Sequence, residues 1–340
     1  DIYPGAEALA AASGSRIVHT KFTPDDSKLK SLDPKFIEQA LVRSKARLGG
    51  VPHCVQMHWW GEPGEDLAQT ASILKECTGK HFRALGVTNM DVAHLEVVRL
   101  HAKVSLCQVS ISLIDRRALG KFRAYCAEHG IPLVAYGALA GGFLHERWLG
   151  AEEPAPQDVA PPKRKYLARI RLTLGWAEFQ NLLQDLRMVA KRRRATISQV
   201  ALAWTLHHAS GLILGDPKES NVNSAVHSLD LKLSDEDMVQ LERDLPASGV
   251  YDVERDAEHP IGRNLVPFRS LNLAAKHEAE AQQRAAEQPA NVFAHEEQRI
   301  LQLPVAQASS SSYGVPARWL LQQHHCMTVP ETARTVRSNL

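Results

Sequence analysis

The sequence lacks long apolar runs, paired cysteine motifs and a strong net charge of either sign. No stretch of its 340 residues approaches the roughly 18 consecutive apolar residues of a membrane-spanning helix. Forty Lys and Arg balance 38 Asp and Glu, a net charge of +2, which gives no argument for nucleic-acid binding. The five cysteines form no CxxC pair, which argues against a disulfide framework or a zinc site. We therefore expect a soluble protein of a reducing, cytoplasmic compartment, with no metal and no nucleic-acid or membrane partner.

Short apolar runs alternate with segments of helical periodicity. Five runs start at residues 16, 53, 82, 106 and 131, and a sixth, GLILG, spans 211–215. They are continuously apolar, as strands buried on both faces are, and their spacing suits β-α units. Asp33 before Pro34, Asp91, and Ser234 three residues before Asp237 mark helix starts. The sequence thus predicts a parallel sheet covered by helices.

Polar residues gather at the ends of these runs. Lys21, His58, Asn89 and Tyr136 each end or follow one, and Gln108 lies inside another. Each alone has a simpler reading, such as a solvated lysine or a packing histidine. Because active sites of α/β folds lie where parallel strands end, the set together indicates a site, although it names no reaction.

Beyond residue 272 the pattern changes. Residues 274–303 are rich in Ala, Glu and Gln, 309–312 are four serines, and 313–340 show no periodicity. We expect a domain at 1–272 and a partly helical or disordered extension at 273–340.

The ordered motifs resemble those of the aldo-keto reductase family. They are DIYPGAEAL (1–9), IVHTKF (17–22), VQMHWW (55–60), ALGVTNMD (84–91), QVSISLIDRRAL (108–119) and AYGALAGGFL (135–144). The resemblance covers roughly residues 1–260. It implies a (β/α)8 TIM barrel with about six of its eight strands present, because the family's first strand and most of its second have no counterpart. It also implies NAD(P)H-dependent reduction of an aldehyde or ketone to an alcohol.

The resemblance assigns three catalytic residues. Tyr3 matches the family's proton-donating tyrosine, Lys21 its partner lysine, and His58 the histidine that orients the carbonyl. A lysine ammonium lowers the pKa of a nearby phenol, so the proton moves more readily to the developing alkoxide. The family's fourth catalytic residue, an aspartate five positions before the tyrosine, would fall ahead of Asp1.

The resemblance also assigns a cofactor site. Asn89 and Gln108 match residues that bind the nicotinamide carboxamide, and Tyr136 matches the ring that stacks on it. The residues expected along the pyrophosphate and the 2′-phosphate are Gly137, Leu139, Gly141, Gly215 and Lys218. The resemblance implies NADP as the cofactor. Asp216 and Glu219 would repel its 2′-phosphate, which makes NAD the alternative.

Two other hypotheses remain open at this level. The chain could be a non-catalytic relative that binds a nucleotide or a partner, with residues 273–340 as an interaction arm. It could also be a fragment that does not fold alone. Neither the particular carbonyl substrate nor the oligomeric state follows from the sequence.

Overall fold

The computed structural model describes residues 17–24, 32–59, 63–215, 219–243, 245, 319–322 and 326–328. The chain divides into two units, residues 1–253 with 317–340 and residues 254–316, and every described residue belongs to the first. Two predicted site residues, Tyr3 and Lys218, lie outside the described residues.

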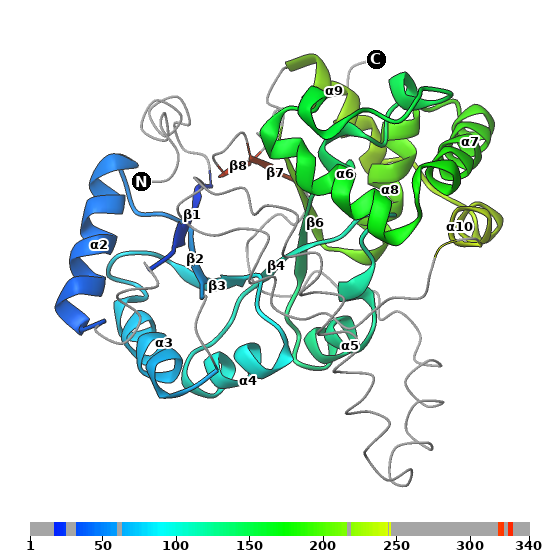
Figure 1. The fold of residues 1–340 in the computed structure, drawn as a ribbon. Helices are drawn as coiled ribbons and strands as arrows, with labels where there is room; N and C mark the ends of the chain where they lie inside the picture. The colour runs from blue at the N-terminus through cyan, green and yellow to red at the C-terminus, as the bar shows by residue number, and fades with distance from the viewer. Residues whose placement is uncertain are drawn as a thin grey trace, which may run out of the picture. The chain divides into compact units, whose positions relative to one another are not determined.

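Six parallel strands form a curled half-barrel, which confirms the predicted fold (Figure 1). Each pairs with the next along the chain. The strands are β1 (His19–Phe22), β2 (Cys54–His58), β3 (Ala84–Thr88), β4 (Cys107–Ser110), β5 (Leu133–Tyr136) and β6 (Gly211–Leu214). All six lie within the runs that the sequence predicts as strands.

The C-terminal segment adds two short strands to the same sheet. β7 (Trp319–Gln322) pairs in parallel with β6, and β8 (Cys326–Thr328) pairs antiparallel with β7. β8 also contacts β1. The pattern of 313–340 does not predict these strands.

Helices pack outside the strands (Figure 1). They are α2 (Pro34–Arg47), α3 (Glu65–Cys77), α4 (Val92–His101), α5 (Lys121–Glu128), α6 (Pro161–Thr173), α7 (Trp176–Arg193), α8 (Ile197–His208), α9 (Glu219–Val226) and α10 (Asp235–Glu242). The predicted helix starts are confirmed, because Asp33, Asp91 and Ser234 each accept a hydrogen bond from the backbone amide three residues later. None of the helices in the described ranges has the length and hydropathy needed to cross a bilayer.

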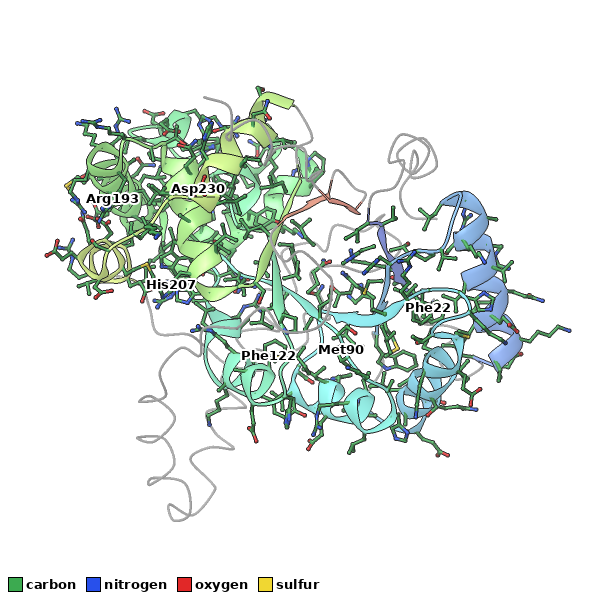
Figure 2. All side chains as sticks on the ribbon, turned by 180° about the vertical axis from the view of Figure 1, so that it is seen from behind. Phe22, Met90, Phe122, Arg193, His207 and Asp230 are labelled. Carbon is green, nitrogen blue, oxygen red and sulfur yellow. The ribbon has the colours of Figure 1, made fainter. Side chains whose placement is uncertain are left out.

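Apolar side chains form two layers, one on each face of the sheet. The outer layer lies between strands and helices and includes Phe22, Met90 and Phe122 (Figure 2). The inner cluster lies inside the curl and consists of Cys54, Leu106, Val134, Tyr136 and Ile213. Because successive strand residues face opposite sides, strands buried on both faces read as continuous apolar runs.

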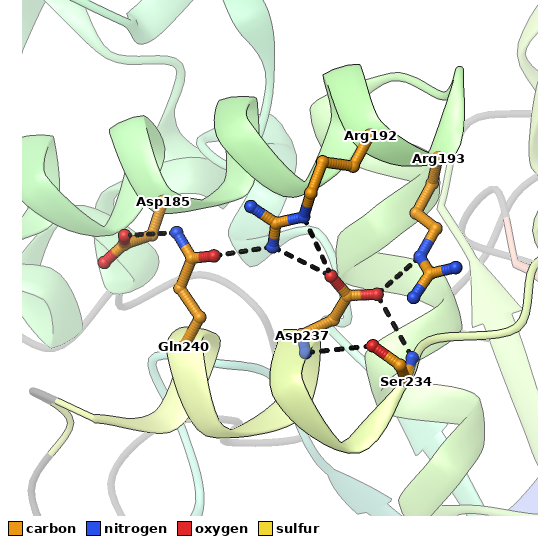
Figure 3. A network of polar contacts seen from close by, with 6 residues as sticks. All are labelled: Asp185, Arg192, Arg193, Ser234, Asp237 and Gln240. Atoms are coloured by element: carbon orange, nitrogen blue, oxygen red, sulfur yellow. Dashed lines mark hydrogen bonds and ion pairs between the residues drawn. The ribbon is translucent and has the colours of Figure 1, made fainter.

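The buried carboxylate of Asp237 in α10 forms ion pairs with α7 (Figure 3). The side chain of Asp237 is 1% exposed, and its Oδ1 accepts a 2.8 Å hydrogen bond from Arg192 Nη2. Its Oδ2 accepts from Arg193 Nε and from the backbone amide of Ser234. Burial raises the pKa of the Asp237 carboxyl, but these hydrogen bonds outweigh it and hold the pKa below its ordinary value.

We expect Asp237→Ala to lower the free energy of unfolding by about 2 kcal/mol, because two guanidinium groups and a helix cap lose their acceptor. The lowered pKa makes this contribution full above the ordinary value of 3.8 and lost as the pH falls below it. Urea unfolding at several pH values measures both effects. Asp235→Ala, at an exposed position in the same first turn, is the control. Equal losses in the two variants would contradict the role of Asp237.

Candidate active site

Three of the predicted site residues lie at one end of the curled sheet. His58 and Tyr136 are the last residues of β2 and β5, and Asn89 directly follows β3. His58 lies four positions after Cys54, a member of the inner cluster, so its side chain faces the same interior. His58, Asn89, Gln108 and Tyr136 are all buried. The parallel register therefore gathers these polar side chains inside the curl.

Three of them form a chain of contacts. The Tyr136 hydroxyl donates a 2.9 Å hydrogen bond to Asn89 Oδ1. Asn89 Nδ2 lies 3.5 Å from His58 Nε2. We refer to Tyr136, Asn89 and His58 as the polar relay; it joins residues from three strand ends.

The backbone of Asn89 is in the left-handed region, with φ at 52°. Asparagine adopts this conformation more readily than other non-glycine residues. The Asn89 amide N–H donates a 2.9 Å hydrogen bond to the Gln108 carbonyl, which holds the turn against β4. This turn places an amide side chain, instead of a further strand residue, between Tyr136 and His58.

Further polar groups of the interior lack a hydrogen-bond partner among the described residues. They are Gln108 Oε1, both side-chain polar atoms of Gln56, Thr88 Oγ1 and both ring nitrogens of His19. Unsatisfied buried polar atoms are costly, so they mark places where a polar ligand or another part of the chain binds. Our sequence reasoning missed His19 and Gln56. The sequence could have indicated them, because His19 lies two positions before Lys21 and Gln56 two positions before His58. Residues two apart on a strand share the same face.

Lys21 is half-buried, and the β1–β2 register sets it opposite Gln56. Two positions earlier on the same face, His19 is 3% exposed. Burial, together with repulsion from His53 and Lys21, lowers the pKa of His19 from 6.5 to about 4. The interior beside β1 therefore favours a neutral imidazole.

This shift predicts a pH-dependent stability. Between 6.5 and about 4 the unfolded chain binds a proton at His19 that the folded chain does not, so acid destabilises the fold in that window. In His19→Gln, the stability lost between pH 6.5 and pH 5 should be smaller by about 2 kcal/mol. Chemical unfolding at each pH measures this. An unchanged slope in His19→Gln would refute the assignment.

A glycine-containing loop follows β5 and packs against α6. Gly137 and Gly141 have φ values of +71° and +64°. A Cβ built on Gly141 would lie 2.5 Å from Cδ2 of Tyr166, and one built on Gly137 would lie 3.1 Å from its Cε1. Lys165 Nζ lies 5.7 Å from the centroid of the Tyr136 ring. Our sequence reasoning missed Lys165 and Tyr166, because only the packing of α6 reveals them.

Gly141→Ala should be more destabilising than Gly150→Ala, although both positions have positive φ. A Cβ at Gly150 has nothing within 4 Å, whereas one at Gly141 would displace the Tyr166 ring. We expect a difference of about 1–3 kcal/mol in the free energy of unfolding, measured with urea. Equal losses would mean that the Tyr166 contact imposes no constraint on this loop.

Two further predicted site residues, Leu139 and Gly215, differ in their burial. Leu139 lies half-buried in the glycine loop, and Gly215 is exposed directly after β6. Within the described ranges, no group of three or more His, Cys, Asp or Glu side chains is arranged to hold a metal ion.

Parallel strands with polar residues at their carboxyl ends, covered by helices, define an α/β barrel protein with its candidate site inside the curl. Residues 6–244 match the aldo/keto reductase family, and the chain belongs to that family.

Relatives and solved structures agree with this assignment. The NADH-specific methylglyoxal reductase of Escherichia coli is 25% identical over 225 residues, which are 63% of this chain and 65% of that protein. The versiconal hemiacetal acetate reductase of Aspergillus parasiticus is 24% identical over 234 residues, 66% of each chain. The chain thus spans about two thirds of the length of these relatives.

Two solved structures share the fold. The holo form of aldo-keto reductase AKR11C1 from Bacillus halodurans superposes with a TM-score of 0.57 at 19% identity, covering 74% of this chain and 80% of that one. An aldo/keto reductase from Klebsiella pneumoniae in complex with NADP and acetate gives 0.54 at 21% identity, covering 72% and 78%.

Proposed function

We propose that this protein reduces an aldehyde or ketone to an alcohol with a nicotinamide dinucleotide, NADP or alternatively NAD. The observation that carries the proposal is the polar relay, which joins a histidine, an amide and a phenol ring at the strand ends. Aldo/keto reductases use nicotinamide cofactors, and the family assignment supports carbonyl reduction in general.

The inner-face residues fit a nicotinamide group. A carboxamide carries one acceptor and two donor hydrogens, and Gln108 Oε1 is a buried acceptor with no partner in the described part of the chain. Asn89 is held beside Gln108 by the backbone hydrogen bond between them. The Tyr136 ring supplies a flat face beside Asn89, and Gly137 and Gly141 are residues that the family resemblance places along the pyrophosphate.

When bound, the cofactor supplies a hydride to the carbonyl carbon. The chain's own residues then orient the carbonyl oxygen and protonate it. His58 hydrogen-bonds to it and orients it, and Tyr3 donates the proton, with the Lys21 ammonium favouring the phenolate that remains. The roles of Tyr3 and Lys21 come from the family resemblance and are part of the proposal.

The relatives support a small carbonyl substrate without selecting one. Two are named as reductases, of methylglyoxal and of versiconal hemiacetal acetate. NADP is the first choice because it is present in the complex from Klebsiella pneumoniae. NAD is the alternative because the Escherichia coli relative is NADH-specific and because Asp216 and Glu219 carry negative charge where a 2′-phosphate is expected.

The test is oxidation of NADPH and of NADH by the full chain with a panel of aldehydes that includes methylglyoxal. We expect turnover, and a loss of about 100-fold or more in kcat for Tyr3→Phe, because general acid catalysis contributes at least that much. Tyr125→Phe, a phenol on the helix layer, should retain activity.

Two results would contradict the proposal. Cofactor binding by a cooperatively melting chain without turnover would favour the non-catalytic binding module. Absence of both binding and turnover would reject the nicotinamide site altogether.

A further inference from the structure

The side chain of Asn89 has different hydrogen-bonding groups on its two sides. Its Oδ1 accepts from the Tyr136 hydroxyl at 2.9 Å, so the NH2 group is the part that faces His58. Asn89 is 1% exposed, and its left-handed backbone is held by the Gln108 carbonyl. The direction of the Tyr136 hydroxyl bond is therefore coupled to the orientation of this amide.

That orientation constrains the imidazole of His58. Asn89 Nδ2 lies 3.5 Å from His58 Nε2, and two N–H donors cannot pair with each other. His58 Nε2 must then be the acceptor, and a neutral ring carries its hydrogen on Nδ1. If the amide were reversed, Oδ1 would face His58 and the hydrogen would be held on Nε2.

The position of Lys165 favours the arrangement in which the NH2 group of Asn89 faces His58. Its ammonium lies 5.7 Å from the centroid of the Tyr136 ring and draws electron density from it. A phenol polarised in this way is a stronger hydrogen-bond donor and a weaker acceptor. Tyr136 therefore donates to the amide oxygen instead of accepting from the amide NH2.

We propose that the Tyr136 hydroxyl is a positioning group that sets the tautomer of His58 through Asn89. The consequence for catalysis rests on the function proposed above. In the ligand-free protein Nε2 of His58 is held as an acceptor, and a polar ligand that takes the Asn89 NH2 frees Nε2 to carry the hydrogen that faces a carbonyl oxygen.

The tautomer can be read by ¹⁵N–¹H correlation spectra of the histidine rings in the full, ligand-free chain. The signals of His58 are those lost in His58→Gln, and a thermal melt of that variant confirms that it folds. We expect the Nδ1–H tautomer in the wild type. In Tyr136→Phe, which keeps the ring but lacks the hydroxyl, we expect a mixture of both tautomers.

Asn89→Asp gives a second, independent test. In this variant the hydrogen of His58 is expected on Nε2, whereas in the wild type it is expected on Nδ1. A carboxylate has no N–H to offer, so it should draw the hydrogen of His58 to Nε2. Aspartate also tolerates the left-handed backbone at this position. Tyr125→Phe is the matched control, because that hydroxyl pairs with Arg99 on the helix layer and should leave the His58 signals unchanged.

The proposal is overturned if ligand-free wild-type His58 carries its hydrogen on Nε2, or if Tyr136→Phe leaves the tautomer unchanged. A wild type without turnover would reject the proposed function, while the spectra would still decide the positioning role.

Discussion

The parallel register of the six strands is the constraint on which the candidate site depends. Neighbouring strands are aligned so that their carboxyl ends meet, and alternation sends every second side chain into the interior. His58 and Tyr136 end β2 and β5 and are 78 positions apart in the sequence numbering, yet both contact Asn89. A shift of one residue in β2 would turn His58 toward the helices and break the relay.

Much of the fold could be predicted because its signals are local. The six central strands are apolar runs bounded by turns, and Asp33, Asp91 and Ser234 mark helix starts by capping chemistry that acts within three residues. β7 and β8 could not be predicted, because their place in the sheet is set by backbone pairing with β6 and with each other. Backbone pairing of this kind needs no periodic side-chain pattern.

The site was predictable where residues end a strand and not where separate segments meet. His58, Asn89 and Tyr136 could be proposed from their positions in the runs, and the structure places the three side chains in contact. Tyr166 could not be found in this way, since its importance comes from the close approach of its ring to Gly141. Tyr3 and Lys218, which the family resemblance supplied, lie outside the described residues.

The electrostatics of the interior fit the chemistry proposed for it. The Lys165 ammonium stands over the Tyr136 ring, and the charge of Lys21 contributes to keeping His19 neutral. Cations held beside a buried interior stabilise negative charge more strongly than they would in water, because the surrounding dielectric is low. Both the phosphates of a dinucleotide and the oxygen of a carbonyl accepting hydride carry such charge. The Asn89 amide between the Tyr136 phenol and the His58 imidazole orients both groups, because it accepts a hydrogen bond on one side and offers N–H on the other.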